Sequence, residues 1–184
     1  QFDVAERGFS TRFEADLDMR MNQESAFSAY DVVNSYEESK LRSVLFQYGE
    51  LRTAAGMARV IVEARKNGGI TTSEQLKKAL GRFLPKHKEN KILAQVYQAI
   101  RIEVNQELSQ LDTLLEKIET FAAPNAIIVI LSFHSLEDKR IKRFVKQSET
   151  LYFDPKSVIK PNKEERAQNS RSRSTKCRVI KKRA

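Results

Sequence analysis

Hydrophobic positions follow two different spacings along this chain, and each spacing predicts a different kind of element. Between residues 25 and 121, apolar side chains recur every three or four positions, which is typical of amphipathic helices. Residues 126–131 (AIIVIL) are apolar without a break, which favours a strand buried on both faces of a parallel sheet. The pattern therefore predicts an α/β protein in which a helical segment precedes a strand.

The helical segment is divided by residues that start or stop helices. Capping-box-like spacings predict starts at Ser28 with Asp31, Ser35 with Glu38, and Thr71 with Glu74. Glycines at 68 and 69 and a proline at 85 predict stops. The helices expected from these signals span residues 29–34, 36–47, 50–66, 72–84 and 92–121. Residues 1–24 lack periodicity and are expected to form an ordered loop.

The longest predicted helix, 92–121, carries one apolar stripe and a polar set beside it. Gln98, Arg101 and Asn105 lie together next to the stripe. Their amide and guanidinium groups can read base edges or bind a carboxylate. An intrahelical polar network is the alternative, and the pattern alone favours it modestly.

The apolar run is followed directly by Ser132, Phe133 and His134. Because ligands of open α/β sheets bind beyond the carboxyl ends of such strands, Ser132 and His134 are candidate site residues. Site and scaffold roles are therefore equally open for Ser132 and His134. A Ser-His-acid hydrolase is disfavoured, because no nucleophile elbow is present. Ser135 with Asp138 is expected to cap a helix over 136–147. Two late strands, 157–161 and 176–180, and a helix over 163–168 complete the expected elements.

Composition narrows the function classes. The 184 residues are 40% hydrophobic, enough for a packed core, and the longest apolar run is too short to span a bilayer. A single cysteine, Cys177, and two histidines make a disulfide or a transition-metal cluster improbable, so no metal is expected and the cytoplasm is the default location. A site for a hard cation such as Mg²⁺ or Ca²⁺ at Asp16 and Asp18 is an alternative that no sequence motif supports.

Positive charge is concentrated at the carboxyl end. The net charge is +9, and residues 166–184 hold eight lysines or arginines and no acid, which leaves residues 1–165 at +1. Within this segment, Arg171, Arg173 and Lys176 alternate with small hydroxyl residues, a pattern that suits phosphate contact. A flexible basic tail is the alternative.

Several motifs together resemble one family, the bacterial ribosomal RNA small-subunit methyltransferase H. They occur in the family's order over nearly the whole chain. The matching segments are 6–10 (ERGFS), 17–21 (LDMRM), 31–34 (DVVN), 48–50 (YGE), 98–105 (QAIRIEVN) and 132–138 (SFHSLED).

The resemblance implies an α/β, class I (Rossmann-like) methyltransferase sheet with an inserted all-helical domain. The expected division is a loop over 1–24 after the fourth core strand, a helical substrate-recognition domain over 25–117, and core strands and helices over 118–184. It also implies an enzyme that methylates the N4 amine of a cytidine in the decoding region, with S-adenosylmethionine as cofactor. The implied partners are small-subunit ribosomal RNA or the assembled subunit and no membrane, and a homodimer stays open.

For individual residues, the resemblance makes Gln1 a cofactor contact, since it matches the last residue of a family motif. Ser132 and His134 would line the pocket of the target base, while Arg101, Asn105, Arg171, Arg173 and Lys176 would bind RNA. The family's glycine-rich cofactor loop has no counterpart among the six glycines. The chain is therefore expected to be the later part of a longer protein and inactive alone, and a non-catalytic RNA- or protein-binding helical fragment is the alternative.

Overall fold

A computed structural model describes residues 7–11 and 13–184, without the side chains at 155–157, 170 and 171. The chain forms two compact units, Gln1–Glu107 and Leu108–Ala184. The first unit is helical, and the second combines helices with a small sheet, so the expected mixture of helices and strands is confirmed. The division into a loop, an inserted domain and core strands concerns a longer protein and stays a prediction.

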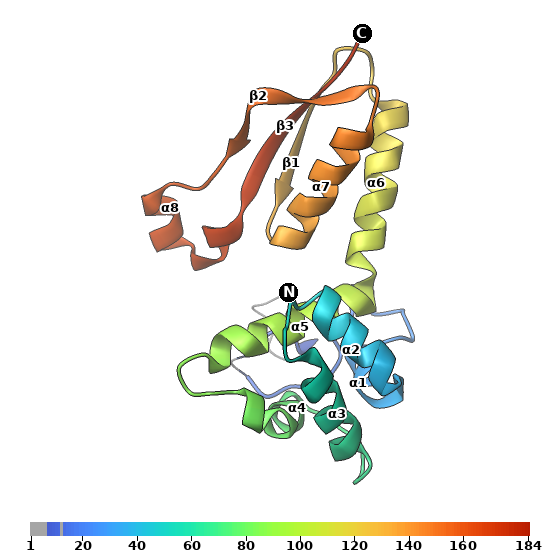
Figure 1. Ribbon diagram of the computed structural model, residues 1–184, viewed down its shortest axis with the longest axis vertical. Helices are drawn as coiled ribbons and strands as arrows, with labels where there is room; N and C mark the ends of the chain where they lie inside the picture. Colours follow the sequence, from blue (N-terminus) through green and yellow to red (C-terminus); the bar gives the residue numbers. More distant parts are fainter. Residues whose placement is uncertain (1–6, 12) are drawn as a thin grey trace. The chain divides into compact units, whose positions relative to one another are not determined.

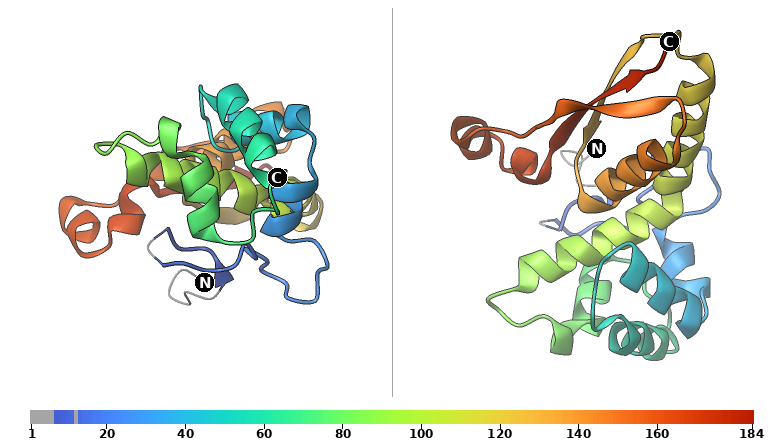
Figure 2. Two further views of the ribbon diagram at one scale, coloured as in Figure 1. Left: turned by 90° about the horizontal axis from the view of Figure 1, so that it is seen from below. Right: turned by 45° about the horizontal axis from the view of Figure 1, so that its top comes forward.

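In the first unit, the long helix α5 (Glu89–Asn105) contacts two short helices, and a further helix, α3 (Ala54–Arg65), packs mainly against α2 (Glu38–Gln47). α1 and α2 both lie along α5 (Figures 1 and 2). On α5 the stripe Leu93, Val96, Ile100 and Val104 is buried, as the apolar spacing predicts. The helices of this unit are α1 (Ala29–Ser35), α2 (Glu38–Gln47), α3 (Ala54–Arg65), α4 (Ser73–Ala79), a 3-10 turn (Gly81–Phe83) and α5 (Glu89–Asn105).

The presence of the helices was predicted more accurately than the residues at which they begin. The capping box of Ser28 with Asp31 is confirmed, with the Asp31 carboxylate accepting hydrogen bonds from the Ser28 N–H and hydroxyl, each at 2.8 Å. The box expected at Ser35 is wrong, because α2 begins after Glu37. The third box is displaced by one residue, to Thr72 with Gln75. Adjacent serines and threonines offer equivalent caps, so spacing alone cannot choose between them.

One continuous helix over 92–121 is wrong. The chain leaves α5 at Gln106, whose φ of 50° is left-handed, and a new helix, α6 (Glu107–Phe121), begins at the next residue. Arg101 spans the break and binds the Glu107 carboxylate through two bonds of 2.7 and 2.9 Å. The break does not interrupt the apolar spacing, since Val104 and Leu108 are four positions apart, and this is why the pattern missed it.

The second unit is a three-stranded sheet with α6 and α7 on one face (Figure 1). The strand order is β1-β3-β2, and both pairings are antiparallel. Its buried core consists of Leu115, Ile141, Val145, Leu151 and Ile180. The elements after α6 are β1 (Ile127–Ser132), α7 (Ser135–Gln147), β2 (Leu151–Ile159), α8 (Lys163–Gln168), a 3-10 turn (Ser170–Ser174) and β3 (Lys176–Lys182).

Strand β1 differs from its prediction in two ways. Its described partner, β3, is antiparallel rather than parallel. Only one face is covered: Ile128 and Ile130 pack against the core, whereas Ile127, Val129 and Leu131 are 66%, 62% and 53% exposed. The expected two buried faces are therefore not found within the described residues. The late strand over 176–180 and the helix Lys163–Gln168 are confirmed, whereas the strand expected over 157–161 is the end of a longer strand, β2, that begins at Leu151.

Candidate functional site

The carboxyl end of β1 places Ser132 deep in the second unit. Ser132 pairs with Lys176 of β3, and its side chain is almost completely buried. The Ser132 hydroxyl donates to the Lys176 carbonyl oxygen at 3.3 Å. The structure thus brings together two residues that the sequence analysis singled out separately, and the bond ties the end of β1 to the start of β3.

His134 follows as the N-cap of α7, with only 11% of its side chain exposed. The Glu137 carboxylate accepts hydrogen bonds from the backbone N–H groups of Phe133 at 2.7 Å and His134 at 3.3 Å. His134 Nε2 lies 3.5 Å from the other Glu137 oxygen. The expected Ser135 and Asp138 cap is therefore wrong by one residue, and the imidazole is held where β1 becomes α7.

Asp138, released from capping, forms a buried ionic cluster that joins α7 to β3. Its two carboxylate oxygens bind Arg178 Nε at 2.6 Å and Lys176 Nζ at 2.7 Å, and the Arg178 guanidinium also lies over the Phe153 ring at 5.2 Å. Burial acts to raise the pKa of Asp138, but the hydrogen bonds from Arg178 and Lys176 outweigh it and lower the pKa. This carboxylate is therefore ionised and fully engaged, and it is not suited to act as a base.

Sequence reasoning missed Arg178 and Glu137. The signal for Arg178 was its position two residues before Ile180, because alternate residues of a strand share a face. An arginine on a buried face needs an acidic partner. Glu137 lies three residues after His134, the spacing of a capping box with histidine in the place of serine.

Of the remaining predicted RNA contacts of the second unit, two lie on the 3-10 turn Ser170–Ser174 and one lies at the start of β3. Arg173 is exposed on the turn. The backbone at Arg171 belongs to the same turn. Lys176, at the beginning of β3, is a third exposed although it binds Asp138. Phosphate contact by all three stays a prediction.

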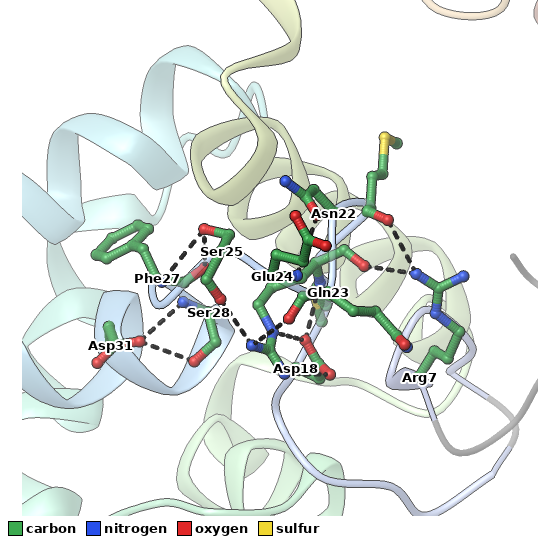
Figure 3. Close-up of polar contacts among 12 residues, drawn as sticks. Arg7, Asp18, Asn22, Gln23, Glu24, Ser25, Phe27, Ser28 and Asp31 are labelled. Atoms are coloured by element: carbon green, nitrogen blue, oxygen red, sulfur yellow. Dashed lines mark hydrogen bonds and ion pairs between the residues drawn. The ribbon is translucent and has the colours of Figure 1, made fainter.

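In the first unit, the expected ordered loop is built around two arginines (Figure 3). The guanidinium of Arg7 donates to the carbonyl oxygens of Arg20 at 2.7 Å and Met21 at 3.2 Å. The Arg20 guanidinium binds both oxygens of Asp18, at 2.6 and 3.1 Å, and also the Ser25 carbonyl at 2.7 Å. The hydrogen bond from Arg20 holds the pKa of Asp18 below its ordinary value. Asp18 is thus already neutralised by an arginine.

The polar set on α5 anchors this loop and its neighbour. The Asn105 side chain accepts from the Met21 N–H at 2.6 Å and donates to the Met19 carbonyl at 2.8 Å, where Met19 has a left-handed φ of 56°. Gln98 donates to the Tyr48 carbonyl at 2.9 Å. Asn105 also donates to the Arg101 carbonyl within α5, at 2.8 Å. Most bonds of these side chains lead outside their own helix, so an intrahelical network describes only part of the set. RNA contact by Arg101 and Asn105 stays a prediction, and both already have protein partners.

Comparison with known proteins decides the family. A family model described as the MraW methylase family matches residues 1–183. The chain belongs to the MraW methylase family. The resemblance seen in the sequence motifs is thereby confirmed.

Curated members of the MraW methylase family agree. Proteins named ribosomal RNA small subunit methyltransferase H from Flavobacterium johnsoniae and Christiangramia forsetii are 48% and 47% identical to this chain, covering 99% of it. The protein of that name from Bacteroides thetaiotaomicron is 38% identical over 98% of the chain. The chain spans 65% of the length of the first two relatives and 64% of the third.

A methylase needs a place for its methyl donor, and no glycine-rich cofactor loop is found among the described residues. The predicted cofactor contact, Gln1, lies outside the described residues. Gly8, with a φ of 70°, is a packing glycine, because a Cβ there would lie 2.5 Å from the Asp16 carbonyl oxygen. Among the described residues no three metal-binding side chains gather, and no helix is long and apolar enough to cross a membrane.

Proposed function

We propose that this chain forms the substrate-side part of an enzyme that methylates small-subunit ribosomal RNA. The proposed reaction transfers a methyl group from S-adenosylmethionine to the N4 amine of a cytidine in the decoding region. The family match over residues 1–183 carries this proposal, and the names of the curated relatives support the choice of RNA. Because the chain spans 65% of those relatives, the reaction is proposed for the longer protein.

We further propose that β1, β2 and β3 are one edge of a class I methyltransferase sheet. The exposed apolar face of β1 supports this, since Ile127, Val129 and Leu131 are unusual residues for a solvent-facing strand. In that arrangement residues 25–117 are an inserted helical domain, residues 1–24 its entry loop, and residues 118–184 part of the core. Further strands and helices of the relatives would cover the open face.

The chemistry asks mainly for positioning. A cytosine amine is a weak nucleophile because its lone pair is delocalised into the ring, so a pocket must hold the amine in line with the methyl group. The base must also leave its stack to reach such a pocket. We propose that His134 lines the pocket and that Ser132 fixes the strand end beneath it, since the Ser132 hydroxyl is already bonded to Lys176. The RNA contacts proposed are Arg101, Asn105, Arg171, Arg173 and Lys176.

The cofactor itself does not fit the described residues. None of the described glycines lies in a phosphate- or nucleoside-binding motif, and Gln1 is the sole candidate contact. The donor site belongs, in this proposal, to the part of the relatives that this chain does not match.

A chimera tests the proposal. This chain would replace the matching residues of the Flavobacterium johnsoniae relative, and transfer of tritium from labelled S-adenosylmethionine to small ribosomal subunits lacking the modification would be measured. We expect incorporation by the chimera and none by the 184-residue chain alone. A folded chimera that binds the cofactor but transfers nothing would contradict the proposal.

Two variants of the chimera test the pocket. His134→Asn keeps a good N-cap residue but removes the imidazole, so we expect a large loss of methyl transfer with little change in melting temperature. Glu149→Gln is the control, because Glu149 is an exposed residue just after α7. Asp138 is nearer to His134 but is buried, so a substitution there would also disturb folding. Unchanged transfer by His134→Asn would remove His134 from the pocket.

One observation favours a second candidate function, a non-catalytic RNA-binding fragment. The described residues lack a cofactor loop yet carry a strongly basic carboxyl segment. Under this alternative the chain binds RNA with a steep salt dependence, and the chimera transfers no methyl groups. Binding and transfer together exclude it.

A further inference from the structure

The outer face of α7 carries a stripe of positive charge that the proposed site does not use. It consists of Lys139, Lys142, Arg143 and Lys146, and we call it the α7 basic stripe. Successive residues of an α-helix are about 100° apart, so these four positions fall within an arc of about 100°. All four residues are exposed.

The acids of α7 are engaged elsewhere and, among the described residues, are not recorded as partners of Lys142, Arg143 or Lys146. The helix has two acidic residues, Glu137 and Asp138, both in its first turn. Glu137 caps the helix and Asp138 binds Arg178 and Lys176. Over the described part of the chain, no ion pair with a carboxylate is recorded for Lys142, Arg143 or Lys146.

The neighbouring cation on α7 has a different use, which shows that the stripe is not simply all the positive charge of the helix. Arg140 turns toward α6 and forms an ion pair with Asp112. The opposite face of α7 packs Ile141 and Val145 into the core. Charge that could have been spread around α7 is thus collected on one side, away from both the core and α6.

We propose that the α7 basic stripe binds the phosphate backbone of the substrate RNA. The stripe is about 10 Å long, at 1.5 Å per residue, and a stacked strand places one phosphate per roughly 3.4 Å of its axis, so about three phosphates fit alongside. The guanidinium of Arg143 can hold one phosphate through two bonds, and the lysines serve as point charges. The choice of RNA as partner rests on the proposed function.

The α7 basic stripe begins close to the proposed pocket for the target base. Lys139 lies only five residues from His134, the N-cap of the same helix, so the stripe starts about one and a half turns from the proposed pocket. A strand held along α7 would therefore be held close to the nucleotide that must be flipped. None of the RNA contacts proposed above lies on α7, which makes this a separate surface.

Charge removal on the stripe, matched by equal removal elsewhere, tests the proposal. The triple variant Lys142→Gln/Arg143→Gln/Lys146→Gln and the control Lys78→Gln/Lys86→Gln/Lys91→Gln each remove three exposed positive charges. Binding of the 184-residue chain to a fluorescein-labelled 20-nucleotide oligouridylate would be measured by anisotropy from 0.05 to 0.5 M salt, a range of about one decade. Oligouridylate isolates backbone contacts from base recognition.

We expect the stripe variant to bind roughly tenfold to a hundredfold more weakly at 0.1 M salt, and its plot of log Kd against log salt to be shallower by about 2. The control should keep the wild-type slope. Equal effects of the two variants, or no effect of the stripe variant, would overturn the proposal, since net charge alone would then explain binding.

Two further probes separate RNA from other anionic partners. Phosphatidylserine-containing vesicles and polyglutamate would be titrated with the same proteins. A loss of vesicle or polyglutamate binding by the stripe variant as large as the loss of RNA binding would overturn the assignment to RNA. These measurements need no methyl donor, so failure of the stripe and failure of the methyl transfer of the chimera are distinguishable.

Discussion

The two units of this chain solve the burial of apolar residues in opposite ways. In the first unit, buried residues from every helix and from the entry loop form one cluster, and the loop itself is bonded into place by Asn105. In the second unit, a cluster of five buried residues lies on one side of the sheet while the other side of β1 is open. Among the described residues, the first unit therefore has one continuous core, whereas the sheet of the second unit is covered on one face at β1.

The comparison shows what each unit depends on. A helical unit with one continuous core is destabilised mainly by substitutions that shorten a buried apolar side chain. A sheet covered on one face depends more on the polar links between its layers, here the cluster of Asp138 with Arg178 and Lys176. Substitutions in the two units should therefore have separable effects on hydrogen exchange, which reports opening segment by segment.

The largest effect is expected from Asp138→Asn. It leaves the buried Arg178 without a counter-charge and should destabilise the second unit by about 3–5 kcal/mol. Hydrogen exchange should rise across residues 108–184 and stay unchanged across 13–107. Asp154→Asn, which breaks the partly exposed ion pair with Lys181, is the control and should change little.

The same carboxylate gives a pH test with a definite sign. Because the pKa of Asp138 is lowered in the folded protein, its contribution is fully present above the unfolded-state pKa, about 3.9, and is lost as pH falls through the folded value. The stability of the second unit should therefore fall on acidification in the wild type and fall less in Asp138→Asn. Parallel acid profiles of the two proteins would contradict the ionic role of the cluster.

Core truncation in the first unit should rank next. Ile100 is fully buried in α5, so Ile100→Ala should cost about 2–5 kcal/mol, through lost burial and a cavity. Urea unfolding followed by exchange should place the loss in residues 13–107. If exchange rose equally in both units, the view that the first unit has its own continuous core would be wrong.

A smaller effect is expected from Asn105→Ala. It removes hydrogen bonds to Met19 and Met21 of the loop and one to the Arg101 carbonyl of α5. We expect a cost of about 1–3 kcal/mol, with faster exchange mainly in the entry loop, because the backbone of α5 keeps its own helical bonds. Gln98→Ala removes one bond, to the Tyr48 carbonyl, and leaves the entry loop untouched as a matched control. Rapid exchange of α5 itself in Asn105→Ala would mean that the residue holds the helix rather than the loop.

The smallest effect in this chain is expected on the open face of β1. Val129→Lys on the open face of β1 should change the stability of this chain by less than about 0.5 kcal/mol. In the chimera the same substitution should strongly reduce folding and methyl transfer, because we propose that this face becomes covered. Ile130→Lys, on the inner face, should be damaging in both proteins. Tolerance of Val129→Lys by the chimera would show that β1 stays open there.

The sequence predicted the existence of helices and strands better than the residues at which they begin and end. Helical spacing located most of α5 and an unbroken apolar run located β1. Asn162, whose side chain accepts from the Glu165 N–H at 2.8 Å, starts α8 at the predicted residue. Single-residue decisions were missed at Gln106, where a left-handed residue breaks a continuous stripe, and at His134, where histidine caps in place of Ser135. Such choices depend on tertiary bonds that periodicity does not record.

The candidate site was located but not resolved by sequence. Ser132 and His134 do lie where β1 meets α7, as the strand-end argument predicted. Lys176, which accepts a hydrogen bond from Ser132, comes from β3, 44 positions away. Arg178 of the same strand binds Asp138, and only the antiparallel register of β1 and β3 brings these residues to the end of β1. A predicted parallel sheet could not have paired Ser132 with Lys176, so the wrong strand direction hid the ionic cluster.

The open side of β1 also has a colloidal consequence. Within the described residues its outer edge has no strand partner, and an unpaired edge beside exposed Ile127, Val129 and Leu131 is a template for sheet extension by a second molecule. The net charge of +9 opposes such stacking through mutual repulsion. Added salt screens that repulsion, so this chain alone should turn turbid as ionic strength rises, whereas a protein with β1 covered should stay clear.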